Sequence, residues 1–82
     1  MSPDDNVIDI HRPVDFSING RPYRSETRRR TAADLLRLAG VDPARHRLAE
    51  LRVKRLRPVP FGSGEIVRIR RGSCFLVLAA VR

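Results

Sequence analysis

Residues 14–20, Val14-Asp15-Phe16-Ser17-Ile18-Asn19-Gly20, alternate apolar and polar side chains and end in a turn dipeptide. Alternation with a period of two predicts a strand with one buried face. Asn-Gly is the strongest short-range signal of a β-hairpin, because both residues tolerate the positive φ of a type I′ turn. Residues 21–25, with Tyr23 at their centre, are then the returning strand. The sequence therefore predicts a domain that opens with a β-hairpin.

A short amphipathic helix is expected after a polar connector over residues 26–30. Thr31 is a good N-cap, and Asp34 three residues later completes a pattern similar to a capping box. Apolar side chains then recur with the spacing of one helix face, at Ala32, Leu35, Leu36 and Ala39. Gly40 suits the left-handed position after a helix, and Pro43 prevents continuation. Because a helix of about nine residues is not stable alone in water, we expect it to pack on the hairpin.

The second half of the chain predicts further strands separated by turns. Leu48, Leu51 and Val53 indicate a third strand among basic residues. Next come a proline-rich segment at 58–60, a turn at 62–64, a short strand at 65–69, a turn at 71–72 and a strongly apolar last strand at 73–81. The segment Pro58-Val59-Pro60 is not expected to be a central strand, since each proline lacks a ladder donor.

This order of a hairpin, a helix and two or three further strands in one mixed sheet predicts an α+β fold. It is the order of a ubiquitin-like β-grasp, in which the first and last strands are neighbours at the centre of the sheet and the helix crosses one face. We expect residues 14–82 to form this single domain. Residues 1–13, which contain two prolines and three aspartates, are expected to be a flexible N-terminal leader.

The last strand is apolar on both faces. Phe75, Val77, Ala79 and Val81 fall on one face, and Cys74, Leu76, Leu78 and Ala80 on the other. A sheet covered by one helix leaves its second face open, so Leu76 and Leu78 are predicted to form an interaction patch with the neighbouring Arg68 and Arg70. Two alternatives stay open: a loop or the leader covers these leucines, or they belong to the core and Phe75 and Val77 face outward.

The composition excludes several functional classes. The chain of 82 residues has a single cysteine, Cys74, so neither an intramolecular disulfide nor a zinc site is expected, and no cofactor is predicted. No paired acids or Ser/His/Asp spacing suggests catalysis, so the chain is predicted not to be an enzyme. It lacks an apolar stretch of about 18–20 residues and a signal peptide, which predicts a cytoplasmic protein without a membrane partner.

The basic character of the chain has two explanations. The formal net charge is +8, with sixteen arginines and one lysine, and such a skew is also produced by a genome rich in G and C. A basic run comprises Arg45, Arg47, Arg52, Lys54, Arg55 and Arg57. Readers of single-stranded nucleic acid interleave aromatic side chains for stacking, and this run has none. We therefore expect a solvated edge that discourages aggregation, with an acidic protein partner as the next alternative and nucleic acid as less favoured.

Three segments carry a resemblance to a known family. They are Phe16-Ser17-Ile18-Asn19-Gly20-Arg21-Pro22-Tyr23, the helix and turn Thr31-Ala32-Ala33-Asp34-Leu35-Leu36-Arg37-Leu38-Ala39-Gly40-Val41-Asp42-Pro43, and Glu65-Ile66-Val67-Arg68-Ile69-Arg70-Arg71-Gly72-Ser73-Cys74-Phe75. Together they resemble bacterial ubiquitin-like domains of the multi-ubiquitin family. The resemblance implies a ubiquitin-like protein modifier that docks on an activating enzyme, a conjugating enzyme and a metalloprotease of the deubiquitinase type, in operons associated with defence against phage.

Conjugation in ubiquitin uses a C-terminal glycine pair, whereas the last glycine here is Gly72. The resemblance then leaves two functions: conjugation through the non-glycine residue Arg82, or a non-covalent adaptor that is never conjugated. As the only lysine, Lys54 is the possible side-chain acceptor of an isopeptide bond.

Overall fold

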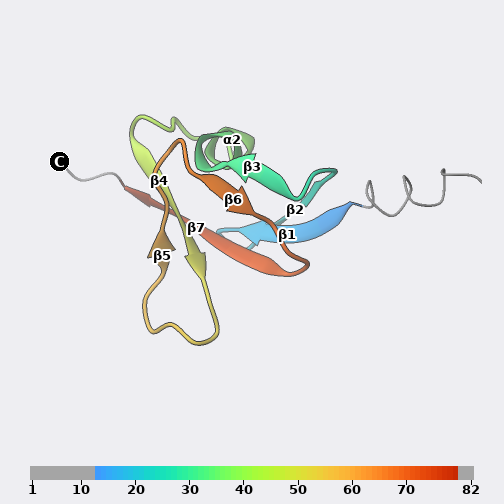
Figure 1. Cartoon of the computed structure of the whole chain (residues 1–82). Coiled ribbons are helices and arrows are strands. Elements are labelled where there is room, and N and C mark those ends of the chain that lie inside the picture. Colours follow the sequence, from blue (N-terminus) through green and yellow to red (C-terminus); the bar gives the residue numbers. More distant parts are fainter. Residues whose placement is uncertain (1–12, 80–82) are drawn as a thin grey trace, which may run out of the picture.

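The computed structural model describes residues 13–79 and contains a mixed five-stranded sheet with one helix against it (Figure 1). Across the sheet the strands follow the order β2-β1-β7-β4-β5. Their bounds are Arg21–Ser25 for β2, Val14–Ile18 for β1, Ser73–Ala79 for β7, His46–Leu51 for β4 and Val59–Pro60 for β5. β1 and β7 are parallel, and the other neighbours are antiparallel. The predicted α+β class and the central, adjacent placement of the first and last strands are confirmed.

The opening hairpin forms as predicted, and its turn is tied to the last strand. Asn19 and Gly20 have φ values of 53° and 79°, which are both positive as a type I′ turn requires. The backbone N–H of Asn19 donates to the carbonyl of Phe75 at 2.9 Å. Its side-chain Oδ1 accepts from the backbone N–H of Val77 at 3.0 Å. Asn19 therefore both makes the turn and fixes β7 beside β1.

The helix α2 spans Ala32–Leu38 and is capped at both ends. Thr31 Oγ1 accepts a hydrogen bond from the backbone N–H of Asp34 at 3.1 Å, which confirms the predicted N-cap. At the other end the N–H groups of Gly40 and Val41 donate to the carbonyls of Arg37 and Leu36. With φ of 84° at Gly40, this is a Schellman motif. The helix has seven residues where about nine were expected, because Ala39 is its C-cap and not its last helical residue.

We expect Thr31→Ala to lower the free energy of unfolding by about 0.5–2 kcal/mol, because the N–H of Asp34 loses its acceptor. Urea denaturation followed by circular dichroism measures this change. Thr31→Ser is the matched control, since it keeps the hydroxyl oxygen and should retain most of the stability. Equal losses for both substitutions would contradict a capping role.

A second, two-stranded sheet was not predicted. β3 (Arg29–Thr31) pairs antiparallel with β6 (Ile66–Arg68). Residues 26–30 were expected to be only a connector, and the strand at 65–69 was expected to extend the one mixed sheet. Both expectations are wrong in this respect, because β6 leaves the plane of the main sheet to reach β3. The carbonyls of Glu65 and Ser63 then accept from the first N–H groups of α2, at Ala32 and Ala33.

The core lies between α2 and the sheet. Its largest fully buried side chains include Phe75, Ile18, Leu35, Leu36 and Leu48. The Phe75 ring packs edge-on against Phe16 at a centroid distance of 5.9 Å, and Phe61 lies 6.4 Å from it on another side. The core therefore joins the centre of the sheet to the helix. The face opposite α2 is named here the open face.

The single helix in residues 13–79 lacks the length and apolar character that crossing a membrane requires.

Candidate protein-binding face

The open face of β4 and β7 carries an apolar patch. Cross-strand partners share a face of a sheet, and the register pairs Leu51 with Cys74, Ala49 with Leu76 and Arg47 with Leu78. Ala49 also pairs with Pro60 of the edge strand β5. We name these side chains the open-face patch: Ala49, Leu51, Pro60, Cys74, Leu76 and Leu78. Leu51 is 49% exposed and Leu78 is 36% exposed, so aliphatic surface faces solvent where the two longest strands pair.

The two predicted leucines therefore lie together and outside the core. Phe75, one residue away, is 1% exposed and points toward α2. The alternative in which Phe75 faced outward is wrong. Leu76 is half-buried among its neighbours in the patch, and the small Ala49 between Leu76 and Pro60 is fully buried. The strand β7 therefore divides its apolar residues between the core and the open face.

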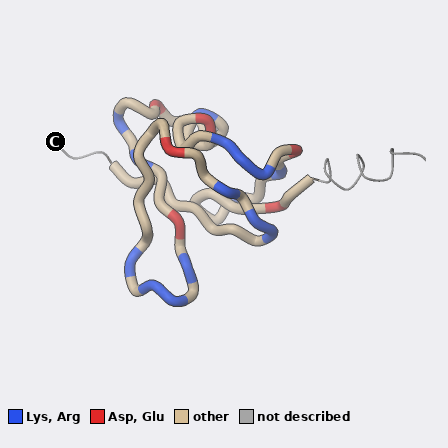
Figure 2. The backbone as a smooth tube through the Cα atoms, viewed as in Figure 1, with Lys and Arg blue, Asp and Glu red and all other residues tan. Residues whose placement is uncertain are grey.

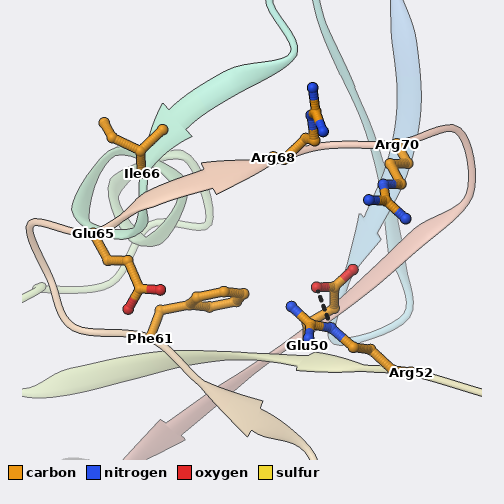
Figure 3. A pocket seen from close by; sticks show the side chains of 7 residues that line it. All are labelled: Glu50, Arg52, Phe61, Glu65, Ile66, Arg68 and Arg70. Atoms are coloured by element: carbon orange, nitrogen blue, oxygen red, sulfur yellow. Dashed lines mark hydrogen bonds and ion pairs between the residues drawn. The ribbon is translucent and has the colours of Figure 1, made fainter. Parts of the chain in front are cut away.

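Arg68 and Arg70, predicted to flank the leucines, line a different surface. They form one side of a pocket of about 370 Å³, with Phe61 and Glu50 opposite them (Figure 3). Glu50 pairs across the ladder with Phe75, so it lies on the helix side of the sheet. Leu76 and Leu78 therefore lie together, but Arg68 does not lie beside them. Arg47, paired with Leu78, is the arginine that lies beside the two leucines.

The two carboxylates of that pocket each have a hydrogen-bond partner. Arg52 Nε donates to Glu50 Oε1 at 3.0 Å (Figure 3). Glu65 Oε1 accepts from the backbone N–H of Gly62 at 3.0 Å, which closes the turn before β6. The two carboxylates thus have structural partners. Neither is placed beside a nucleophile or a histidine among the residues that line this pocket.

The half of the open face on β1 and β2 is polar. Asp15 Oδ1 accepts from Arg24 Nε at 2.8 Å, and both side chains are exposed. This hydrogen bond and the positive charge of Arg24 lower the pKa of Asp15, with a smaller contribution from Arg71. An exposed pair of this kind contributes little to stability. Because the Asp15–Arg24 pair occupies the β1 and β2 side of the open face, the apolar area is confined to the side of β4 and β7.

The loop between β4 and β5 concentrates basic charge (Figure 2). Arg52, Lys54, Arg55 and Arg57 all lie in residues 52–58, and all four are exposed. Between them, Val53 and Leu56 are 103% and 104% exposed. The prediction that Val53 continues the third strand is wrong, since β4 ends at Leu51. Lys54, the possible acceptor, stands on this loop, where a partner can reach it.

Other predicted residues give no further chemistry. Cys74 is exposed and forms no disulfide within residues 13–79. The carbonyl oxygen of Asp42 lies 3.1 Å from His46 Nδ1 and accepts its N–H, an interaction within the turn before β4. Within residues 13–79, no three side chains of the metal-ligating types gather into a site. The leader at 1–13, apart from Pro13, and the C-terminal residue Arg82 lie outside the described residues.

Leu51, Ala49 and Pro60 of the patch, and Arg47 beside it, were not predicted from the sequence to lie with the two leucines. β4 begins with His46 and Arg47, and β5 has only two residues, so neither strand shows a clear alternation. The face of the β4 residues is set by pairing with β7, more than twenty positions away, and that of Pro60 by pairing with β4.

Comparisons with protein-family models, with curated proteins and with solved structures give no match.

Proposed function

We propose that this chain is a ubiquitin-like β-grasp domain that binds proteins through its open face. The single observation that carries the proposal is the open-face patch, in which Leu51, Leu76 and Leu78 offer aliphatic surface. Aliphatic patches of this kind on small domains usually mark interaction sites. The strand order and the parallel pair of first and last strands are compatible with the β-grasp and support this assignment.

The chemistry of the patch specifies its partner. The apolar side chains are bordered by Arg47 on β4 and by the basic loop at 52–58. A complementary surface has an apolar centre that covers Leu76 and Leu78 and acidic side chains on its rim. Charge complementarity of this type increases association rates and selects partners, while the buried apolar centre supplies most of the affinity.

Within this proposal the partners are the activating and conjugating enzymes of a bacterial ubiquitin-like pathway, together with its metalloprotease. The resemblance of residues 16–23, 31–43 and 65–75 supports this choice. The carboxylate of Arg82, the proposed attachment residue, would take the adenylyl group of ATP with release of pyrophosphate. A thiolate of the activating enzyme would then displace AMP and form a thioester.

A non-covalent adaptor is the second candidate, and the position of Gly72 favours it. Gly72 lies in the turn between β6 and β7, where its N–H donates to the carbonyl of Asp15 at 2.8 Å. It is part of the fold and is followed by the whole of β7. Residues 73–82 contain no glycine to form the pair used in ubiquitin conjugation.

The experiment that tests the function is intact-mass analysis after incubation with an activating enzyme of the proposed ubiquitin-like pathway, ATP and magnesium. If the chain is a modifier, we expect an ATP-dependent enzyme adduct that disappears when Val81 and Arg82 are removed. A matched chain with Arg82→Lys keeps the length and charge and should still form the adduct. Binding without an adduct would contradict the modifier and leave the adaptor. Absence of binding would contradict both.

A further inference from the structure

A basic groove lies at the end of the sheet where β4 and β7 meet. It has a volume of about 390 Å³ and runs between the β4–β5 loop and the turn that precedes β7. Its apolar lining residues are Leu51, Val53 and Cys74. Leu51 and Cys74 are cross-strand partners on the open face. The groove therefore continues the open-face patch toward the β6–β7 turn.

Both walls of the groove are positively charged. The loop contributes Arg52, Lys54 and Arg55, and the turn contributes Arg70 and Arg71. Glu50 is the single acid in the lining, and it pairs with Arg52. Among residues 13–79, no carboxylate forms an ion pair with Lys54, Arg55, Arg70 or Arg71. A matching ligand has several negative charges placed around aliphatic side chains.

Residues 4–10 of this chain have that chemistry. The segment Asp4-Asp5-Asn6-Val7-Ile8-Asp9-Ile10 holds three aspartates and three aliphatic residues, and it contains no lysine or arginine. It lies outside the described residues. We propose that residues 4–10 bind in the basic groove of their own domain, with the aspartates facing the arginines and the aliphatic side chains covering Leu51 and Cys74.

The geometry of β1 makes this contact reachable within one chain. β1 begins at Val14, and the next carbonyl, that of Asp15, accepts from the N–H of Gly72 in the β6–β7 turn at 2.8 Å. The segment thus joins the domain beside one wall of the groove. Ile10 is four residues from Val14, and an extended chain spans about 3.3 Å per residue. The segment can therefore extend from the turn across the groove to the loop.

The covalent link between residues 4–10 and the domain also favours this segment over other occupants of the groove. A short linker gives the segment an effective concentration in the millimolar range, which exceeds ordinary concentrations of a second copy. Nucleic acid is disfavoured because the groove lining contains no aromatic side chain on which a base could stack. This inference does not depend on the proposed function, since it concerns the chain by itself.

The placement is tested by paramagnetic relaxation in the full chain carrying Ser2→Cys and Cys74→Ser, with a nitroxide on residue 2. We expect strong loss of amide signal for residues 51–55 and 71–74. Residues 40–44, at the opposite end of β4, should keep their intensity. Uniform intensities throughout would overturn the proposal. A mixture of spin-labelled chain and isotope-labelled chain without a nitroxide distinguishes binding within one chain from binding between two chains. Signal loss in that mixture would show that a second copy occupies the groove, and it would overturn the proposal.

The charge complementarity is tested with Asp4→Asn, Asp5→Asn and Asp9→Asn in one chain. This variant keeps the side-chain shapes, and we expect it to lose the signal broadening. In the chain with native Cys74, the bound segment covers this cysteine. The rate at which neutral iodoacetamide alkylates Cys74 should therefore increase by up to about fivefold for each aspartate removed. Glu26→Gln, an exposed substitution outside the groove, is the matched control and should change neither readout. Unchanged broadening and alkylation in the triple variant would overturn the proposal.

Discussion

Replacing Phe75 with alanine is expected to lower the free energy of unfolding by about 3–5 kcal/mol. Phe75 is 1% exposed and contacts both Phe16 and Phe61 through its ring. Removing it leaves a cavity where the central strand meets the helix, and the surrounding side chains can fill that cavity only in part. Since a domain of this size is stabilised by only about 4–12 kcal/mol, a large share of the stability is lost. Urea denaturation monitored by circular dichroism measures the change.

A residue on the opposite face of the same strand is the control for Phe75. Leu78→Ala removes aliphatic atoms from the same strand β7, but from a side chain that is 36% exposed on the open face. Its cost should be smaller, about 1–2 kcal/mol, because the side chain is already 36% exposed and its loss leaves no closed cavity. Similar losses for the two substitutions would contradict the assignment of Phe75 to the core and Leu78 to the open face.

The double substitution Leu76→Asp and Leu78→Asp is expected to weaken binding to the activating enzyme by roughly 100-fold or more. Central aliphatic residues of an interface contribute about 2 kcal/mol or more each, and every 1.4 kcal/mol is a factor of ten. Aspartate adds a desolvation cost and repels the acidic rim expected on the partner. Isothermal titration calorimetry with purified activating enzyme, without ATP, measures the affinity independently of any adduct.

Leu38→Asp is the matched control for this substitution. Leu38 is 42% exposed at the end of α2, so it undergoes the same chemical change at a similar exposure on the other side of the sheet. We expect its affinity to remain within about threefold of the wild type, since surface changes outside an interface cost little. Equal weakening by both variants, with folding retained in circular dichroism, would contradict the open face as the binding surface.

The two surfaces proposed for this chain meet at Leu51 and Cys74. Both residues belong to the open-face patch and both line the basic groove. A partner that covers the whole patch would have to displace residues 4–10 from the groove. The affinity measured for the Asp4→Asn, Asp5→Asn and Asp9→Asn variant would therefore be higher than that of the wild type if both proposals hold.

Local sequence signals determined the elements that depend on short-range chemistry. Asn19-Gly20 specified the hairpin turn, because few residues tolerate positive φ at both positions. Thr31 and Gly40 specified the ends of the helix through its unpaired N–H and carbonyl groups. The alternation of Phe75 and Val77 with Leu76 and Leu78 placed the two pairs on opposite faces of the strand, but both faces are apolar, so the fold decided which one is the core. Each of these signals acts within a few residues along the chain.

Only the tertiary structure decided what depends on long-range pairing. β3 formed from an arginine-rich connector because β6 supplied its hydrogen-bond partners, and no apolar alternation marked it. The register of β4 on β7 placed Leu51 and Arg47 beside Leu76 and Leu78, while Arg68 went to the helix side. The groove that joins Arg71 to Lys54 likewise brings together two loops distant in sequence. Backbone hydrogen bonds between distant strands form with almost any side chain, so the sequence does not reveal which strands will pair. The sequence determined which faces of each strand are apolar. The pairing of the strands in the folded sheet decided which residues lie together on one face.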